Sequence, residues 1–461
     1  MQSYYFSATL LILMAGGGAM RAQNASDIGR AYLFEQAPKT DGERVARLQK
    51  AIEAAEKAMA EEDMEAAAER LDEAEAQMAD WSNELLKRKD VIALLERMNA
   101  VKDLFSAADG DSVKSSEKLE PLTADALRSE LALVESAEAD TAFDFPIDLN
   151  DKVLAFIGAF SGRSKEKIEI SLSRGSKYIP MIHQVLLEEG LPLDLAYLPL
   201  IESGFRNVAV SRAKAVGMWQ FISATGKTYG LRIDNWVDER RDPAKATRAA
   251  ARFLKYLYEL TGDWYLALAG YNAGPGAVTR ATNGTDSRNF WDHARSRYLW
   301  SETKNYVPQF CAAVLVGKHP DRFGLAVEQL EPYTYEVIEI EKSISLTSLA
   351  QRTGIDVETL KELNPELLRR TTPPRLYSLK VPVGKSQDAL EALAAIPATE
   401  RVEFRSYKIQ KGDTLAKVAV RYKTTPEELL DINNITSSQF KVGRTIQVPV
   451  IVQIGAAAQK K

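Results

Sequence analysis

The stretch LPLIESGF, residues 198–205, ends an apolar run with a single carboxylate, that of Glu202. The apolar positions before it are expected to face a core, so the carboxylate should lie among apolar side chains. Such a group costs free energy unless it is paired or protonated. Two interpretations follow: a helix-end glutamate paired with Arg206 or Arg212, or an acid held in an apolar place for use in chemistry.

Helical patterns dominate residues 150–324, where aromatic residues are concentrated. The stretch that starts at Asp242 begins with a capping residue and a proline, and then runs amphipathically as a helix does. A later apolar helix is broken at AGPG, residues 273–276. These features predict an all-α domain with its own core, in which loops of defined chemistry join the helices.

Residues 1–22 have the character of a secretory signal, with an apolar core too short to span a bilayer. No cysteine lies near this segment, so a lipid cannot be attached there through a thiol. We therefore expect export to the periplasm, whereas an uncleaved segment would anchor the chain to a membrane. The single cysteine, Cys311, excludes a disulfide within the chain and is expected to be a buried, inert thiol.

Charge is distributed unevenly beneath a net charge of −5. The apolar residues of the acidic stretch 41–105 recur at helical spacing, which predicts two or three amphipathic helices. We interpret this region as a solvated helical spacer, and residues 106–149, which are poor in aromatics, as a linker. Residues 150–324 are net basic, but no basic run is dense enough to predict nucleic-acid binding. The histidines lack ligand spacing and no phosphate-binding loop is present, so we expect no metal and no cofactor.

Two copies of one small module follow. Residues 405–450 show a strand pattern, two helix patterns and a closing strand pattern, which predicts a strand–helix–helix–strand unit. Residues 333–384 repeat this unit, because SLAQRTGIDVETLKELNPEL aligns without gaps with KVAVRYKTTPEELLDINNIT and places Asn364 opposite Asn433. The first copy lacks the GDTL of the second. Repeated modules indicate repeated binding, in which linked weak sites gain avidity.

Motifs in both halves resemble known families. With YKIQKGDTL, DINN and VGRTIQVPV, the second module resembles the lysin motif, and the first looks like a degenerate lysin motif. Upstream, LIESGF, GMWQF, GYNAGPG and ETKNYVP occur in this order within the length of one domain. Together they resemble the family 1 lytic transglycosylases, which have the goose-lysozyme-like fold of the soluble transglycosylases.

The resemblance implies a multidomain chain with a helical N-terminal region, an all-α lysozyme-like catalytic domain over residues 150–324 and small α+β lysin-motif modules. It implies that the partner is peptidoglycan, cleaved by the catalytic domain and bound through N-acetylglucosamine by the lysin motifs. Glu202 matches the catalytic acid, which would protonate the leaving oxygen and then accept a proton from the 6-hydroxyl of muramic acid, giving a 1,6-anhydro end. Burial suits a glutamate to this acid role. The substrate-binding positions that the motifs imply are Ser203, Met218, Gln220, Tyr271, Asn272 and Tyr306.

These motif side chains suit positioning more than chemistry. Gln220 offers two donors and one acceptor to an N-acetyl group or a sugar hydroxyl. The family places Tyr271 beside the catalytic glutamate, where its hydroxyl can hold the carboxyl. We expect Tyr306 either to hydrogen-bond the sugar or the glutamate, or to pack with one wet end. Met218 is expected to form wall or core.

Glycosidases normally pair two carboxylates, and Asp238, Glu239 and Asp242 are the obvious second candidates. Arginines lie among them and Asp242 has a capping role, so we interpret all three as structural. The lack of a second acid favours a lytic transglycosylase over a hydrolytic muramidase on the same fold, in which water is the nucleophile. The intact motifs argue against a third class, a non-catalytic wall-binding protein.

Overall fold

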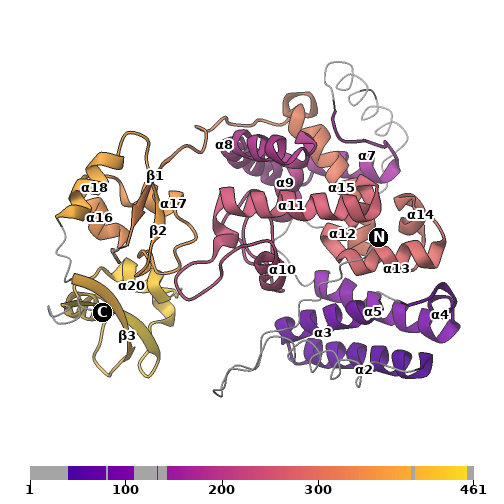
Figure 1. The fold of residues 1–461 in the computed structure, drawn as a ribbon, viewed down its shortest axis with the longest axis horizontal. Coiled ribbons are helices and arrows are strands. Elements are labelled where there is room, and N and C mark those ends of the chain that lie inside the picture. The colour runs from indigo at the N-terminus through magenta and orange to yellow at the C-terminus, as the bar shows by residue number, and fades with distance from the viewer. Residues whose placement is uncertain are drawn as a thin grey trace, which may run out of the picture.

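The structure, a computed structural model, describes residues 40–78, 81–107, 132, 143–341, 343–395, 400–433 and 435–453. The signal-like segment and most of the expected linker lie outside the described residues. The described chain forms a large helical body with two small α+β modules beside it (Figure 1). No helix in these ranges is long and apolar enough to cross a membrane.

The region predicted to be all-α forms most of the helical body. Its longest helix, α8 (Lys165–Glu189), ends at a left-handed glycine, and α11 (Pro243–Thr261) begins where the carboxylate of Asp242 accepts two backbone N–H groups at 3.0 and 3.1 Å. The break predicted at AGPG separates α12 (Trp264–Ala273) from α13 (Pro275–Thr285). The other elements of this body are α7 (Asp151–Ser161), η1 (Leu193–Tyr197), α9 (Leu198–Ser203), α10 (Ser223–Thr228), η2 (Glu239–Arg241), α14 (Phe290–Arg295), α15 (Ser301–Lys318) and η3 (Pro320–Phe323).

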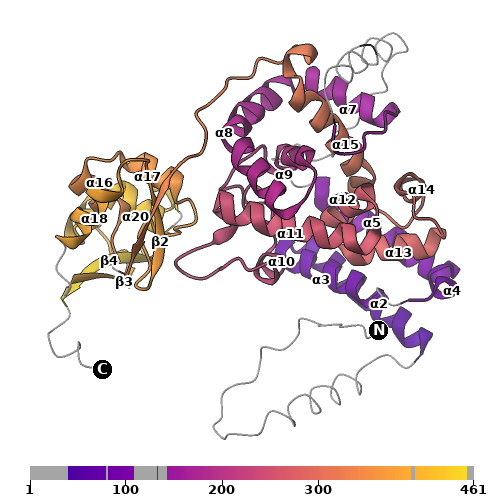
Figure 2. The same ribbon diagram turned by 45° about the horizontal axis from the view of Figure 1, so that its top comes forward.

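The acidic N-terminal region is helical, as predicted, but it is not a solvated spacer. Its helices pack against α13 and α15, and both views of the ribbon place them along one side of the helical body (Figures 1 and 2). Leu48 and Trp81 belong to the same continuous apolar core as Phe310 of α15. The amphipathic pattern of these helices predicted an apolar face but did not indicate the surface against which it packs. The elements are α2 (Asp41–Ala60), α3 (Met64–Gln77), α4 (Asn83–Leu86) and α5 (Lys89–Ala107).

Both C-terminal modules have the predicted strand–helix–helix–strand order. In each, the two strands pair antiparallel, with Ile338 opposite Leu379 in the first copy and Tyr407 opposite Ile446 in the second. The first copy has an additional helix, α18 (Ser386–Ala394), after its last strand. The remaining elements are β1 (Glu336–Ile340), α16 (Leu346–Thr353), α17 (Val357–Leu363), β2 (Tyr377–Val381), β3 (Glu400–Lys408), α19 (Leu415–Arg421), α20 (Pro426–Asn433), η4 (Ser437–Gln439) and β4 (Thr445–Gln453).

The core of the first module is not separate from the helical body, contrary to the expectation of an independent core for residues 150–324. Val237, from the loop before α11, is buried in the core of the module. Conversely, Tyr333 and Leu363 belong to the core of the helical body. Backbone hydrogen bonds reinforce the contact, with Leu368 N–H donating to the carbonyl of Trp236 at 3.0 Å. The helical body and the first module therefore fold against each other.

Candidate active site

Glu202 lies at the end of a short, fully buried helix. Helix α9 continues from η1 with Pro199 in its first turn, and it stops at Gly204, whose φ of 60° is left-handed. Only 3% of Glu202 is exposed, in a setting where an ionised carboxylate needs strong partners. The sequence correctly predicted a carboxylate in apolar surroundings.

The hydroxyl of Tyr306 donates a hydrogen bond to Oε1 of Glu202. Tyr306 is itself buried, on the second turn of α15. Burial, followed by the nearby charge of Glu202, raises its pKa well above the ordinary value of a tyrosine. The hydroxyl therefore keeps its proton and acts as a donor to the carboxyl, one of the two roles that the sequence left open.

The GMWQF motif forms a tight loop that closes over the end of α9. Ser203 Oγ donates to the carbonyl of Met218 at 2.9 Å, so α9 and the loop are tied together next to Glu202. Both Ser203 and Met218 are buried, which gives them structural contacts here. A Cβ at Gly217, where φ is 88°, would collide with the carbonyl of Arg240, so the loop requires glycine at this position.

Gln220 and Trp219 take different places in this loop. Gln220 is half-buried with a left-handed φ of 51°, and its Nε2 donates to the carbonyl of Gly217 at 2.8 Å. Its amide oxygen is thus oriented by the loop itself, as a substrate-binding amide requires. Trp219 is completely buried and donates from Nε1 to Thr247 Oγ1 at 2.9 Å, so it is a core residue and not a stacking platform.

The third motif links the second to the fourth. The hydroxyl of Tyr271 donates to the carbonyl of Trp219 at 2.8 Å. Asn272 donates from Nδ2 to Glu302 Oε1 at 2.9 Å and accepts from Thr303 Oγ1 at 2.7 Å. With the bonds of Ser203 and Tyr306, all four motifs are thus joined by direct hydrogen bonds. The sequence did not single out Glu302 or Thr303, although both lie within ETKNYVP.

The structure differs from the sequence expectation in which tyrosine touches the glutamate. Tyr271 was expected to hold the carboxyl, but its hydroxyl donates to the backbone of the second motif, whereas Tyr306 donates to Glu202. Burial and then the charge of Glu202 raise the pKa of Tyr271 as well, so it is also a neutral neighbour of the site. The packing of the helices thus gives Tyr306 the contact with the carboxyl that the resemblance had implied for Tyr271.

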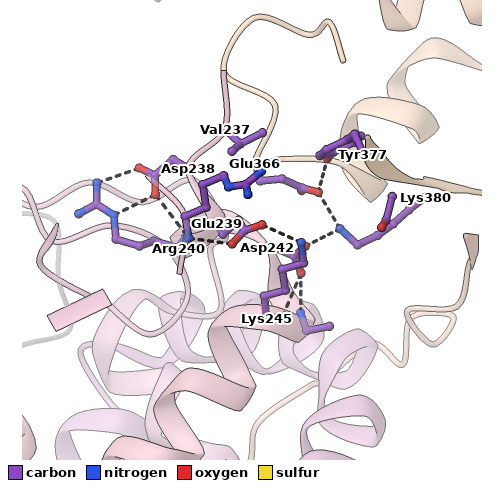
Figure 3. A network of polar contacts seen from close by, with 12 residues as sticks. Val237, Asp238, Glu239, Arg240, Asp242, Lys245, Glu366, Tyr377 and Lys380 are labelled. Carbon is purple, nitrogen blue, oxygen red and sulfur yellow. Dashed lines mark hydrogen bonds and ion pairs between the residues drawn. The ribbon is translucent and has the colours of Figure 1, made fainter. Parts of the chain in front are cut away.

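The three other carboxylates weighed as a second acid are all committed to structural contacts (Figure 3). Asp238 forms a buried pair with Arg240 at 2.8 Å, and Glu239 pairs with Lys245 at 2.7 Å. Asp242 caps α11 and also binds Lys380 of the first module at 2.7 Å. The structural interpretation of these residues is confirmed.

Two further groups were considered for chemistry. Cys311 is completely buried, and burial raises the pKa of its thiol, as expected of an inert cysteine. Within the described ranges no group of three or more His, Cys, Asp or Glu side chains is placed to hold a metal ion.

Comparison with known families agrees with this arrangement. Residues 185–294, which contain Glu202 and the next two motifs, match the family described as "Transglycosylase SLT domain". The chain thus contains a transglycosylase SLT domain. Residues 407–449 match the LysM domain, and residues 334–398 match "Lytic transglycosylase MltD, LysM-like domain". The two C-terminal modules are thus two different kinds of lysin motif.

Individual proteins are similar to parts of the chain. The chain is 29% identical over 315 residues to membrane-bound lytic murein transglycosylase D of Escherichia coli strain K12, covering 65% of this chain and 68% of the relative. It is 29% identical over 111 residues to the cell wall-binding protein YocH of Bacillus subtilis, covering 24% and 33% of the two chains. The solved 70 kDa soluble lytic transglycosylase of Escherichia coli is 14% identical, with a TM-score of 0.29 over 69% of this chain and 57% of that one. The fold assignment rests on the observed helices and the family matches.

Proposed function

We propose that the chain cleaves the β-1,4 bond between N-acetylmuramic acid and N-acetylglucosamine in peptidoglycan without water, leaving 1,6-anhydromuramic ends. Glu202 protonates the glycosidic oxygen as the bond from that oxygen to the anomeric carbon breaks. The 6-hydroxyl oxygen of the same muramic acid then bonds to the anomeric carbon, and its proton passes to Glu202. A tethered hydroxyl has a high effective concentration compared with water, and the acid is restored with no second carboxylate.

The observation that carries this proposal is the buried Glu202 with Tyr306 donating to its Oε1. A donor fixed on Oε1 orients the carboxyl for the exchange of a proton with the substrate. Asp238, Glu239 and Asp242 are engaged elsewhere, which supports a reaction that uses one carboxyl. The half-buried Gln220 and Asn272 supply amides suited to a sugar hydroxyl or an N-acetyl group.

The second lysin motif is assigned to wall binding, with N-acetylglucosamine-containing glycan as its ligand. The support is the LysM match over residues 407–449 and the similarity to a relative named for cell-wall binding. Such a substrate lies outside the cytoplasm. Periplasmic location, with export directed by residues 1–22, is therefore part of the proposal.

Mass analysis of the products from purified peptidoglycan tests the reaction. Anhydro ends are lighter than reducing ends by one water molecule, so a digest that contains only reducing ends would place the chain among the hydrolytic muramidases. Glu202→Gln keeps the shape but removes the acid, and we expect activity to fall by about two to four orders of magnitude. The matched control is Glu239→Gln, which alters the ion pair of the half-buried Glu239 with Lys245 and should retain activity. Equal losses in the two variants would contradict the assignment of Glu202.

A further inference from the structure

Helix α15, which carries Tyr306, is capped from outside its own segment. Its own N-cap residue, Trp300, makes no side-chain capping bond. Instead, the carboxylate of Asp103 on α5 accepts from the backbone N–H of Ser301 at 3.1 Å and from Ser301 Oγ at 2.9 Å. A carboxylate at a helix N-terminus satisfies a free N–H group and interacts favourably with the helix dipole. The N-terminal helices thus fix where α15 begins.

A second N-terminal carboxylate lies against the break between α12 and α13. Glu75 of α3 is buried and binds Lys102 of α5 and Arg280 of α13, the latter at 3.1 Å. Burial alone would raise the pKa of Glu75, but the charges of Lys102 and Arg280 outweigh it and lower the pKa. A Cβ added to Gly274 would lie 3.9 Å from Glu75 Oε2, and one added to Gly276 3.7 Å from the Glu75 carbonyl. Helix α3 therefore packs directly on the AGPG turn.

The Asp103 and Glu75 contacts lie within or beside the motifs ETKNYVP and GYNAGPG. Ser301 lies next to Glu302 and close to Thr303, which hold both ends of the Asn272 amide. Tyr306 follows one turn later and donates to Glu202. Since Lys102 and Asp103 are adjacent on α5, one helix holds the Glu75 cluster and the start of α15 together.

We propose that Asp103 and Glu75 are positioning residues of the active site, acting from the N-terminal helices on Tyr306 and Asn272. Asp103 sets the position of α15 and hence the hydroxyl that orients Glu202. Glu75 holds the start of α13 and hence the turn that follows Asn272. This inference rests on the proposed role of Glu202, and it assigns a catalytic contribution to a region outside the matched SLT segment.

The test is the full chain with Asp103→Ala, assayed with soluble glycan strands. We expect kcat to fall about tenfold with KM within about twofold, because a misplacement of about 1 Å can cost about 10²-fold in rate. Asp103→Asn keeps an acceptor for the Ser301 N–H and should restore most of the rate. The matched control is Asp63→Ala, since Asp63 accepts from Ala66 N–H at 3.1 Å within the same acidic region. Its kcat should stay within about twofold.

A double-mutant cycle distinguishes an effect of Asp103 on the position of Tyr306 from an effect on the stability of the fold alone. If Asp103 acts through Tyr306, the kcat loss caused by Asp103→Ala shrinks to less than about twofold in a Tyr306→Phe background, while the loss of melting temperature persists. An undiminished kcat loss in that background, or an equal kcat loss in Asp63→Ala, would overturn the proposal. The corresponding cycle pairs Glu75→Gln with Asn272→Ala. Product masses of the unmodified chain are measured first, so a hydrolytic product would reject the proposed reaction while leaving the cycle measurable.

Discussion

The two lysin-motif copies share a fold and one polar contact, made by an asparagine that is buried in the first copy and half-buried in the second. In the first copy, Asn364 donates to the carbonyls of Leu360 and Lys380 and accepts from the N–H of Lys380. In the second, Asn433 does the same with Leu429 and Gln447. The gapless alignment of the sequence had placed these two asparagines opposite each other. In both copies the side chain ties the second helix to the last strand, so it is part of the module's own architecture.

The copies differ at the residue that this asparagine holds. Gln447 of the second copy is half-buried and donates across the strand pair to Ser406 Oγ at 3.1 Å. Lys380 of the first copy is 5% exposed and extends instead to Asp242 and Glu366, at 2.7 and 2.8 Å (Figure 3). Burial alone would lower the pKa of Lys380, but the charges of Glu366 and Asp242 outweigh it and raise the pKa. The ammonium is therefore retained in the interface.

The loop between the second helix and the last strand shows the same contrast. Residues 364–367 of the first copy are buried against the loop of the helical body that contains Trp236 and Val237. Residues 436–439 and 441–445 of the second copy are exposed to solvent. The same fold thus packs against the helical body through this loop in the first copy. In the second copy the corresponding loop is exposed to solvent.

The largest expected effect comes from exchanging the residue that distinguishes the copies. Lys380→Gln gives the first copy the residue of the second and leaves Asp242 and Glu366 buried without their cation. Removing one partner of a buried ion pair costs about 3–5 kcal/mol. We expect the free energy of unfolding of the helical body, measured by denaturant titration, to fall by that amount. The reverse exchange, Gln447→Lys, should change the free energy of unfolding of the helical body by less than about 0.5 kcal/mol, because the side chain of Gln447 bonds to Ser406 within the second copy. Similar losses in the two variants would remove the distinction.

A smaller effect is expected from the shared asparagine. Asn364→Ala and Asn433→Ala each leave backbone groups of their module without a partner, at a cost of about 1–3 kcal/mol. The two losses of free energy of unfolding should be similar in size, but they should affect different parts of the chain. Hydrogen exchange should report the first in both module and helical body, and the second within residues 400–453 alone. Weakened protection of α11 in Asn433→Ala would show that the second copy is coupled as firmly as the first.

The smallest effect on stability is expected from deleting residues 400–461. Phe404 of the second copy contacts the rest of the chain, with its ring 5.4 Å from that of Trp236 and the guanidinium of Arg369 4.7 Å above it. An aromatic pair contributes about 0.5–1.5 kcal/mol, so the melting transition of the helical body should move little and product formation from soluble glycan should persist. Sedimentation with insoluble peptidoglycan should decrease. If the truncated chain sediments as well as the full chain, wall binding does not reside in the second copy.

Local patterns in the sequence were sufficient to predict several elements and the burial of the Glu202 carboxylate. Asp242 and Pro243 predicted the start of α11, AGPG predicted the break after α12, and both modules follow the predicted strand and helix order. Capping, glycine turns and hydrophobic periodicity act over a few residues, so they can be predicted from the sequence. The burial of the Glu202 carboxylate could be predicted for the same reason, because its apolar neighbours are adjacent in the chain.

Only the tertiary structure decided which surfaces meet. The acidic helices, interpreted as a spacer, cap α15 through Asp103, and the degenerate lysin motif completes the helical body through Lys380. It also decided that Tyr306, rather than Tyr271, donates to Glu202. Each of these contacts joins residues that are far apart in the chain, and an amphipathic face or a tyrosine in a motif does not encode its partner. The sequence by itself determined the elements and the apolar setting of the Glu202 carboxylate, while packing determined which hydroxyl donates to that carboxylate.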